Sequence, residues 1–203
     1  MSWILLSGLL TFAFVSSITP GPNNMMLMAS GANFGLRRTV PHALGVSLGF
    51  GLMVWMVGWG LAGVIVAFPW IFEVIRWAGG AYLLYLAFKI ATAHGVGVGK
   101  AGGKPITFWQ AVAFQWVNPK AWAMALGGEA TYAAHDHLLL NVSLVAGVFM
   151  LVNAPCISLW AAFGVAMKRA LSRPAAMRAF NVAMALLLVA SLYPLVTERL
   201  VRA

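Results

Sequence analysis

Long apolar runs alternate with short connectors along the whole chain, and these runs set the expected architecture. Their approximate bounds are residues 3–32, 40–67, 70–93, 106–132, 138–167 and 178–196. An apolar run of about 20 residues crosses a hydrocarbon layer about 30 Å thick as an α-helix. Helices suit this role because every backbone polar group must find its partner inside the lipid. The pattern therefore predicts an all-α integral membrane protein with six transmembrane helices.

The first run is interrupted near its middle by the sequence TPGPNN, residues 19–24. Proline lacks a backbone N–H and its ring clashes with the preceding turn. Pro20 and Pro22 should therefore leave the carbonyls near Ser16 and Ile18 without helical partners. A single helix over the whole run would also be about 45 Å long, which exceeds the thickness of the hydrocarbon. We therefore expect this span to be broken into two half-helices.

A broken span can bind both ends of a zwitterion. The first amides of the second half-helix suit a carboxylate, and the carbonyls freed at the end of the first half-helix suit an ammonium. The fourth run repeats this design with Asn-Pro-Lys at residues 118–120. A single proline is explained by a kink in a packed helix, but two such motifs favour a site. The predicted substrate-binding residues are Pro20, Gly21, Pro22, Asn23, Asn24, Asn118, Pro119 and Lys120.

The two proline motifs fall in corresponding places of the two halves of the chain. Three spans per half would give two repeats of opposite orientation, about residues 1–96 and 104–203, within one transmembrane domain, residues 1–203. A glycine-rich linker, residues 94–105, would join them. Matching positions recur about 100 residues apart, and they are Pro20 with Pro119, Ser47 with Ser143, and Arg76 with Arg178. We therefore expect an inverted repeat whose first and fourth spans are broken.

Composition supports the membrane assignment, and the charges predict its orientation. Hydrophobic residues make up 62% of the chain and charged residues 8%, with a mean hydropathy of +0.89. Nine of the thirteen Lys and Arg residues lie at the connectors after the first, third and fifth spans, and all four acids lie toward the other side. The positive-inside rule then places those connectors in the cytoplasm and both termini outside. A net charge of +9 in short clusters suits anionic lipid rather than nucleic acid.

Enzymatic chemistry is not expected. The predicted spans offer no nucleophile with a base, no carboxylate pair and no metal cluster, so we also expect no cofactor. The His-Asp-His sequence at residues 135–137 is expected to be a solvated connector, because two histidines without further ligands do not make a metal site. A cation channel that uses the freed carbonyls is the alternative to a transporter.

Several segments together resemble a known family over nearly the whole chain. They are TPGPNN in the first span, RWAGGAYLLYLAFKIA in the third and KPITFWQAVAFQWVNPKAW in the fourth. In this order they are similar to the LysE/RhtB superfamily of bacterial amino-acid exporters. The resemblance implies a multi-pass carrier of the bacterial inner membrane that exports its substrate by alternating access, driven by the gradient of a proton or another ion. The matching motif positions are Pro20, Gly21, Pro22, Asn118, Pro119 and Lys120.

The distribution of acids bears on the substrate and on coupling. We find no Asp or Glu in the interior of a predicted span, whereas an exporter of lysine or arginine should offer a carboxylate to the cationic side chain. The chain thus resembles the branch that handles small neutral substrates such as cysteine, O-acetylserine, threonine, homoserine or leucine-like amino acids. The residue that carries a coupling proton stays open among Glu129, His42 and Lys120.

Lys120 is the only charged residue between Pro105 and Gly128. Insertion scales assign about 2.5 to 3.5 kcal/mol to a lysine at the centre of a transmembrane helix. We expect its ammonium to face a wet cavity beside residues 20–24, where it would attract the substrate carboxylate or release a proton. The alternative is a cap on the carbonyls freed by Pro119.

Glycine pairs with GxxxG spacing, Gly31 with Gly35 and Gly45 with Gly49, allow helices to approach closely. We expect this packing within the monomer, with a homodimer as the alternative.

Overall fold

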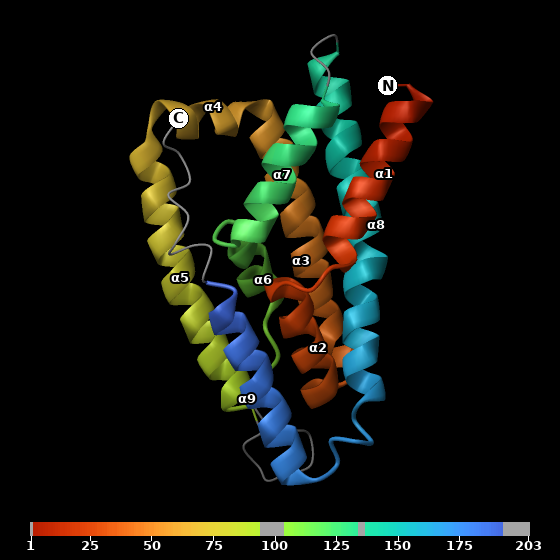
Figure 1. Cartoon of the computed structure of the whole chain (residues 1–203), viewed down its shortest axis with the longest axis vertical. Coiled ribbons are helices and arrows are strands. Elements are labelled where there is room, and N and C mark those ends of the chain that lie inside the picture. Colours follow the sequence, from red (N-terminus) through yellow and green to blue (C-terminus); the bar gives the residue numbers. More distant parts are fainter. Residues whose placement is uncertain (1, 94–103, 134–136, 193–203) are drawn as a thin grey trace.

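The computed structural model describes residues 2–93, 104–133 and 137–192, and these residues are helical with short connections (Figure 1). The elements in chain order are α1 (Trp3–Ile18), α2 (Pro22–Phe34), α3 (Leu36–Met56), the π-helical turn η1 (Val57–Leu61), α4 (Ala62–Ala67), α5 (Pro69–Ala91), α6 (Phe108–Gln115), α7 (Pro119–Tyr132), α8 (Leu138–Ala166) and α9 (Pro174–Ala190). Most of the glycine-rich linker, residues 135–136 of the His-Asp-His sequence and the end of the sixth predicted span lie outside the described residues.

Several described helices have the length and apolarity of membrane spans, which confirms the all-α membrane class. Three qualify by themselves, over Leu36–Ala67, Pro69–Ala91 and Leu138–Ala166. The pair α1 and α2, bent by 53° at its break, counts as a fourth when it is taken as one broken span. Helix α9 is a shorter apolar helix of 17 residues. Six spans therefore remain a prediction.

Both proline motifs interrupt a helix, as predicted. Helix α1 ends at Ile18 and α2 begins at Pro22, while α6 ends at Gln115 and α7 begins at Pro119. Proline is well suited to the first helical position, where its missing N–H would have no helical partner and its fixed φ fits the helix. The two breaks lie near the middle of the molecule, and the chain passes through them in opposite directions (Figure 1).

The second predicted span, residues 40–67, differs from expectation in shape. Helix α3 passes into the π-helical turn η1, and α4 then runs across one end of the molecule toward α5 (Figure 1). The change of direction occurs at Gly60, whose φ of 117° is accessible to glycine and strained for other residues. π-helical turns of this kind interrupt helices frequently at functional sites.

Helix α8 packs against α1, α2 and α3, and two glycines bring it into backbone contact with α2. A methyl group at Gly31 would overlap the carbonyl oxygen of Ala161, and one at Gly164 would overlap that of Met28. Close approach of this kind is what small residues provide in membrane helices, where dispersion contacts replace the hydrophobic effect. The α2–α8 contact therefore fixes the half-helix that carries Asn23 and Asn24.

Three of the four glycines in the two GxxxG pairs, namely Gly31, Gly45 and Gly49, pack against other helices of the same chain. Gly45 and Gly49 face α6, where added methyl groups would meet Phe108 and Val112. Gly35 plays a different role, because it ends α2 with a φ of 79° and no atom lies near the place of its missing side chain.

Two glycines of α8 give a matched test of this packing. We expect Gly164→Ala to lower the free energy of unfolding by about 1 to 3 kcal/mol, because the methyl group meets backbone that cannot rotate away. Gly147→Ala in the same helix enters open space and should stabilise the helix by about 0.5 to 1 kcal/mol. Thermal unfolding of the two detergent-solubilised variants measures the difference. Equal melting temperatures would contradict the close α2–α8 contact.

Candidate substrate site at the two helix breaks

The carbonyls at the end of α1 lose their helical partners, as predicted, and accept hydrogen bonds from side chains instead. The Ser16 carbonyl accepts a bond of 3.0 Å from the Thr19 hydroxyl. The Ile18 carbonyl accepts one of 3.0 Å from the indole N–H of Trp160 in α8. Pro20 and Pro22 have no N–H to offer these two oxygens. The break is therefore held open by specific contacts.

Asn24 fastens the two half-helices together. Its side-chain Nδ2 donates to the Ser17 carbonyl at 2.8 Å and to the Thr19 carbonyl at 2.8 Å. The side chain is only 3% exposed, so these bonds form away from competing water. Asn24 thus directs the donors of its side-chain amide to the end of α1.

Asn23 connects the first break to the second. Its Nδ2 donates to Gln115 Oε1 at 2.8 Å, and Gln115 Nε2 donates back to Asn23 Oδ1 at 3.1 Å. Gln115 is the last residue of α6 and is completely buried. This reciprocal amide pair joins residues that lie 92 positions apart in the sequence.

The Lys120 ammonium crosses from the second break to the first. Its Nζ donates to the Thr19 carbonyl at 2.7 Å, the Thr19 hydroxyl at 2.9 Å and the Pro20 carbonyl at 3.3 Å. An ammonium has three N–H donors, and each has an acceptor here. The stem of Lys120 lies against Gly21, where a methyl group would stand 2.8 Å from Lys120 Cδ. The predicted position of Lys120 beside residues 20–24 is confirmed.

The second break is closed by its own residues. Asn118 caps α7 by accepting a bond of 3.2 Å from the Lys120 backbone N–H, and Pro119 occupies the first helical position. The Trp116 carbonyl accepts a bond of 2.8 Å from the Trp122 indole. The three hydrogen bonds of the Lys120 ammonium described above are with the first break, so a cap on carbonyls freed by Pro119 is not what the structure shows.

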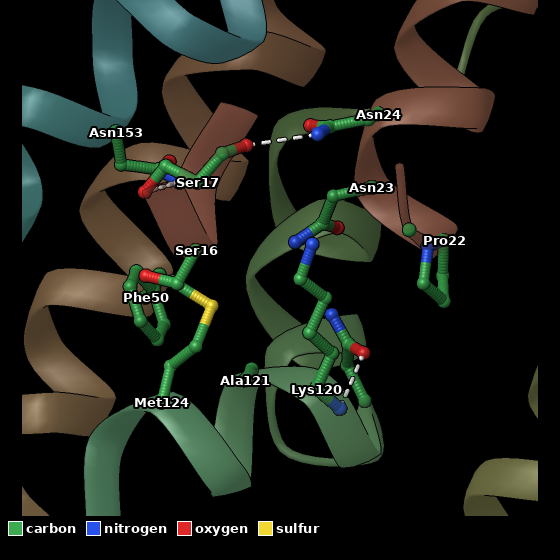
Figure 2. A pocket seen from close by; sticks show the side chains of 12 residues that line it. Ser16, Ser17, Pro22, Asn23, Asn24, Phe50, Lys120, Ala121, Met124 and Asn153 are labelled. Atoms are coloured by element: carbon green, nitrogen blue, oxygen red, sulfur yellow. Dashed lines mark hydrogen bonds between the residues drawn. The ribbon is translucent and has the colours of Figure 1, made fainter. Parts of the chain in front are cut away.

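A small cavity lies where the two breaks meet (Figure 2). The labelled side chains of Asn23, Asn24 and Lys120 converge on it from facing helix ends. Of the eight predicted residues, Gly21, Pro22, Asn23, Asn24, Asn118 and Lys120 line the cavity, whereas Pro20 and Pro119 do not. Its volume of about 20 Å³ holds roughly one water molecule. In this conformation the cavity therefore has no room for a ligand larger than about one water molecule.

The cavity presents groups of opposite polarity. The first residues of α2 have no side-chain cap, because the N-cap residue is Gly21, and uncapped amides at a helix start suit an anion. Asn153 of α8 lines the cavity, and its buried Oδ1 has no hydrogen-bond partner among the described residues. An unpartnered buried acceptor suits an ammonium or hydroxyl group of a ligand.

Polar residues of the site that the sequence reasoning did not assign to it include Ser17 and Gln115. The available signal was a polar side chain within an apolar run. Such residues in membrane helices generally face the bundle interior and mark functional pathways. Serine, however, also bonds to its own helix, so this signal does not identify a partner.

Comparison with known proteins gives a consistent assignment. The family model described as LysE type translocator matches residues 14–196. The chain is 32% identical to cysteine/O-acetylserine efflux proteins of Salmonella typhi, Shigella flexneri and Escherichia coli over 194 residues, which cover 93% of this chain and 96% of each relative. No solved structure matches the chain. The chain therefore belongs to the LysE type translocator family and is a transporter rather than an enzyme.

Proposed function

We propose that this protein exports small neutral amino acids or their derivatives from the cytoplasm, and that the two helix breaks form the substrate site. The observation that carries this proposal is that the carbonyls of Thr19 and Pro20 accept hydrogen bonds from the Lys120 ammonium. Carbonyls that hold a lysine ammonium also suit the α-ammonium of an amino acid. Relatives described as cysteine/O-acetylserine efflux proteins support a small neutral substrate.

In the proposed binding step, the zwitterion inserts between Lys120 and the first break. The substrate ammonium takes the carbonyls that Lys120 leaves and reaches Asn153 Oδ1, while its carboxylate meets Lys120 and the first amides of α2. Every charge then has a partner of opposite polarity, and the net charge of the site does not change. A substrate with one charge alone would leave either Lys120 or the carbonyls without a partner, which is costly in a buried site.

Alternating access is proposed to depend on an inverted repeat. Support comes from the reciprocal contacts between the halves: the first predicted span (α1, α2) packs on the fifth (α8), and the fourth (α6, α7) packs on the second (α3). The third span (α5) packs on the sixth (α9). Exchanging the two halves converts the contact between the first and fifth spans into the contact between the fourth and second spans. It leaves the contact between the third and sixth spans unchanged, as an inverted repeat requires. A proton gradient is proposed to drive the cycle.

The proposed orientation in the inner membrane places both termini in the periplasm. Arg37 lies in the first turn of α3, Lys89 near the end of α5 and Lys168 just after α8, and these three helix ends all lie in the lower part of the molecule in Figure 1. In a variant with Cys156 replaced by Ala, we expect a membrane-impermeant thiol reagent to label a cysteine at Ser2 from outside and to miss one at Gly97. Labelling after permeabilisation is the control. The reverse pattern would overturn the orientation, because the positive-inside rule predicts the opposite.

Flux from reconstituted vesicles tests the function. Vesicles loaded with labelled cysteine, serine, threonine, leucine or lysine should release the neutral amino acids with saturable kinetics and retain lysine. Vesicles loaded in the same way but without the protein are the control. Unitary ion conductance in planar bilayers, without saturable amino-acid flux, would instead identify a channel. Release of lysine at the rate of the neutral substrates would contradict the proposed substrate class.

A further inference from the structure

Glu129 is a buried carboxylate in the last turn of α7, the end proposed to face the periplasm. Its side chain is 8% exposed, and neither carboxyl oxygen has a hydrogen-bond partner among the described residues. The carboxyl group lies against Gly58 in the π-helical turn η1. A methyl group at Gly58 would stand 2.6 Å from Glu129 Oε2 and 2.6 Å from Val142 Cγ1. The missing side chain at Gly58 therefore makes the room that the carboxyl group occupies.

No described group on the elements packed against α7 supplies a counter-charge to this carboxylate. The elements with the most extensive contacts to α7 are α1, η1, α3 and α8, and α1 and η1 contain no ionisable residue. The nearest ionisable residue of α3 to Gly58 is His42, about 24 Å earlier along the helix, and Arg37 and Arg38 lie farther still.

The remaining ionisable neighbours are on α7 and α8. Cys156 lies about 21 Å along α8 from Val142, and Lys120 lies about 13 Å along α7 from Glu129. Tyr132 follows Glu129 by one turn and lies against Phe12 and Gly8 of α1. His137, just before α8, is exposed. A bare carboxylate in this position would be buried without a partner, which proteins avoid by binding a proton or a cation.

An aromatic cluster separates Glu129 from the substrate cavity. Gly128, the preceding residue, packs against the ring of Phe149. That ring makes edge-on contacts with Phe12 at a centroid distance of 5.9 Å and with Phe50 at 5.5 Å. Phe50 itself lines the cavity. Opening the cavity toward the Glu129 end thus requires these rings to move, and the same movement changes the packing of α7 around Glu129.

We propose that Glu129 carries the coupling proton of this exporter. In the closed conformation the carboxyl group holds a proton taken from a periplasmic hydronium ion: one O–H bond of the hydronium breaks, an O–H bond forms on one carboxyl oxygen, and water is left. When α7 moves, the carboxyl O–H bond breaks and the proton passes to a water molecule on the cytoplasmic side. This inference rests on the proposed export function and selects one of three sequence candidates. The Lys120 ammonium already donates hydrogen bonds to three acceptors. His42 is fully buried, and it needs no counter-charge there because a neutral imidazole carries no charge.

Replacing the carboxyl group with its neutral amide tests this proposal. In vesicles containing the Glu129→Gln variant, we expect cysteine efflux driven by an acidic exterior to fall at least about tenfold toward the rate without a gradient. Counterflow exchange of labelled against unlabelled cysteine needs no net proton movement, so it should stay within about twofold of wild type. A pH-sensitive dye in the lumen should report substrate-dependent acidification for wild type and none for the variant. The matched control is Glu73→Gln, because Glu73 is an exposed carboxylate on α5.

Each other outcome has a distinct meaning. If gradient-driven efflux survives in Glu129→Gln, the proposal is overturned. It is also overturned if this variant has a normal melting temperature but has lost both counterflow and gradient-driven efflux. If that variant does not fold, Glu129→Asp should still fold and keep the gradient response, and a response lost there also overturns the proposal. If the wild-type protein shows cysteine counterflow but a proton gradient does not change its efflux rate, proton coupling is rejected while the export function stands. Absence of cysteine counterflow in wild type counts against the proposed function itself.

Discussion

The Lys120→Met variant is expected to insert normally and to lose cysteine export. The ammonium makes three hydrogen bonds to Thr19 and Pro20, and methionine keeps most of the length of the side chain without its charge. Each hydrogen bond to a charged group is worth about 1.5 to 3 kcal/mol. Loss of the partner of the substrate carboxylate should then lower kcat/KM by roughly 10- to 150-fold. Initial efflux rates from vesicles over a range of internal cysteine concentrations measure this effect.

Two further variants separate a substrate role from a structural one. Lys168→Met makes the same change at an exposed position after α8 and should leave export unchanged. Lys120→Arg keeps the charge but replaces a compact ammonium with a planar guanidinium group, so it should raise KM while retaining measurable flux. A Lys120→Met protein with lower thermal stability but an unchanged KM would show that Lys120 only ties the two helix breaks together.

Replacing Pro20 and Pro22 together with alanine is expected to abolish export without harming insertion. The new N–H groups can bond to the Ser16 and Ile18 carbonyls, which now accept from Thr19 and Trp160. A continuous helix would displace the Thr19 and Pro20 carbonyls from Lys120 and bury the first amides of α2 in helical bonds. Displacing binding groups by about 1 Å can cost roughly 100-fold in rate. Vesicle flux at matched protein content measures the loss.

A proline inside an unbroken helix provides the control for this double variant. Pro41 lies within α3, which continues past it, and its side chain is exposed. Pro41→Ala should therefore keep wild-type flux. Melting temperature should stay level or rise in the double variant, because helical hydrogen bonds are restored. Normal export by the Pro20/Pro22 double variant would mean that the first break is only a packing kink.

The helix breaks were predictable from sequence because their cause is local. Pro20, Pro22 and Pro119 lack the N–H that a helix interior needs, and this property does not depend on what surrounds them. The same reasoning named the two carbonyls that lose helical partners, at Ser16 and Ile18, and the structure shows both accepting from side chains. Apolar length likewise indicated the membrane class.

The individual hydrogen-bond partners of the site residues were not predictable, because they join distant parts of the chain, although the sequence did offer a position beside residues 20–24 for Lys120, with a cap on its own break as the alternative. The Asn23–Gln115 pair and the Lys120–Thr19 contact span 92 and 101 positions. Each depends on which faces of two helices meet. No local pattern within α7 distinguishes a lysine that reaches its own break from one that reaches the facing break.

Tertiary packing also decided the environment of Glu129. In the sequence, Glu129 lies with the other acids on the side away from the basic connectors and is one of three candidates for the proton carrier; the structure shows that it is buried. The burial comes from the turn at η1, where Gly58 leaves space for the carboxyl group and Gly60 takes a positive φ. Glycines are common in membrane helices, so their presence in this run did not reveal the turn. The inference of a neutral substrate is unaffected, since Glu129 does not line the cavity.

Competition by analogues that lack one charge tests the central claim most directly, namely that the two breaks bind both ends of a zwitterion. Counterflow of labelled cysteine is measured with unlabelled cysteine, with 3-mercaptopropionate, which lacks the ammonium, and with cysteamine, which lacks the carboxylate. Each analogue leaves one charged or polar partner in the site unsatisfied, at a cost of about 1.5 to 3 kcal/mol. We expect both to inhibit at least about tenfold more weakly than cysteine. Inhibition by either analogue as strong as that by cysteine would contradict the account.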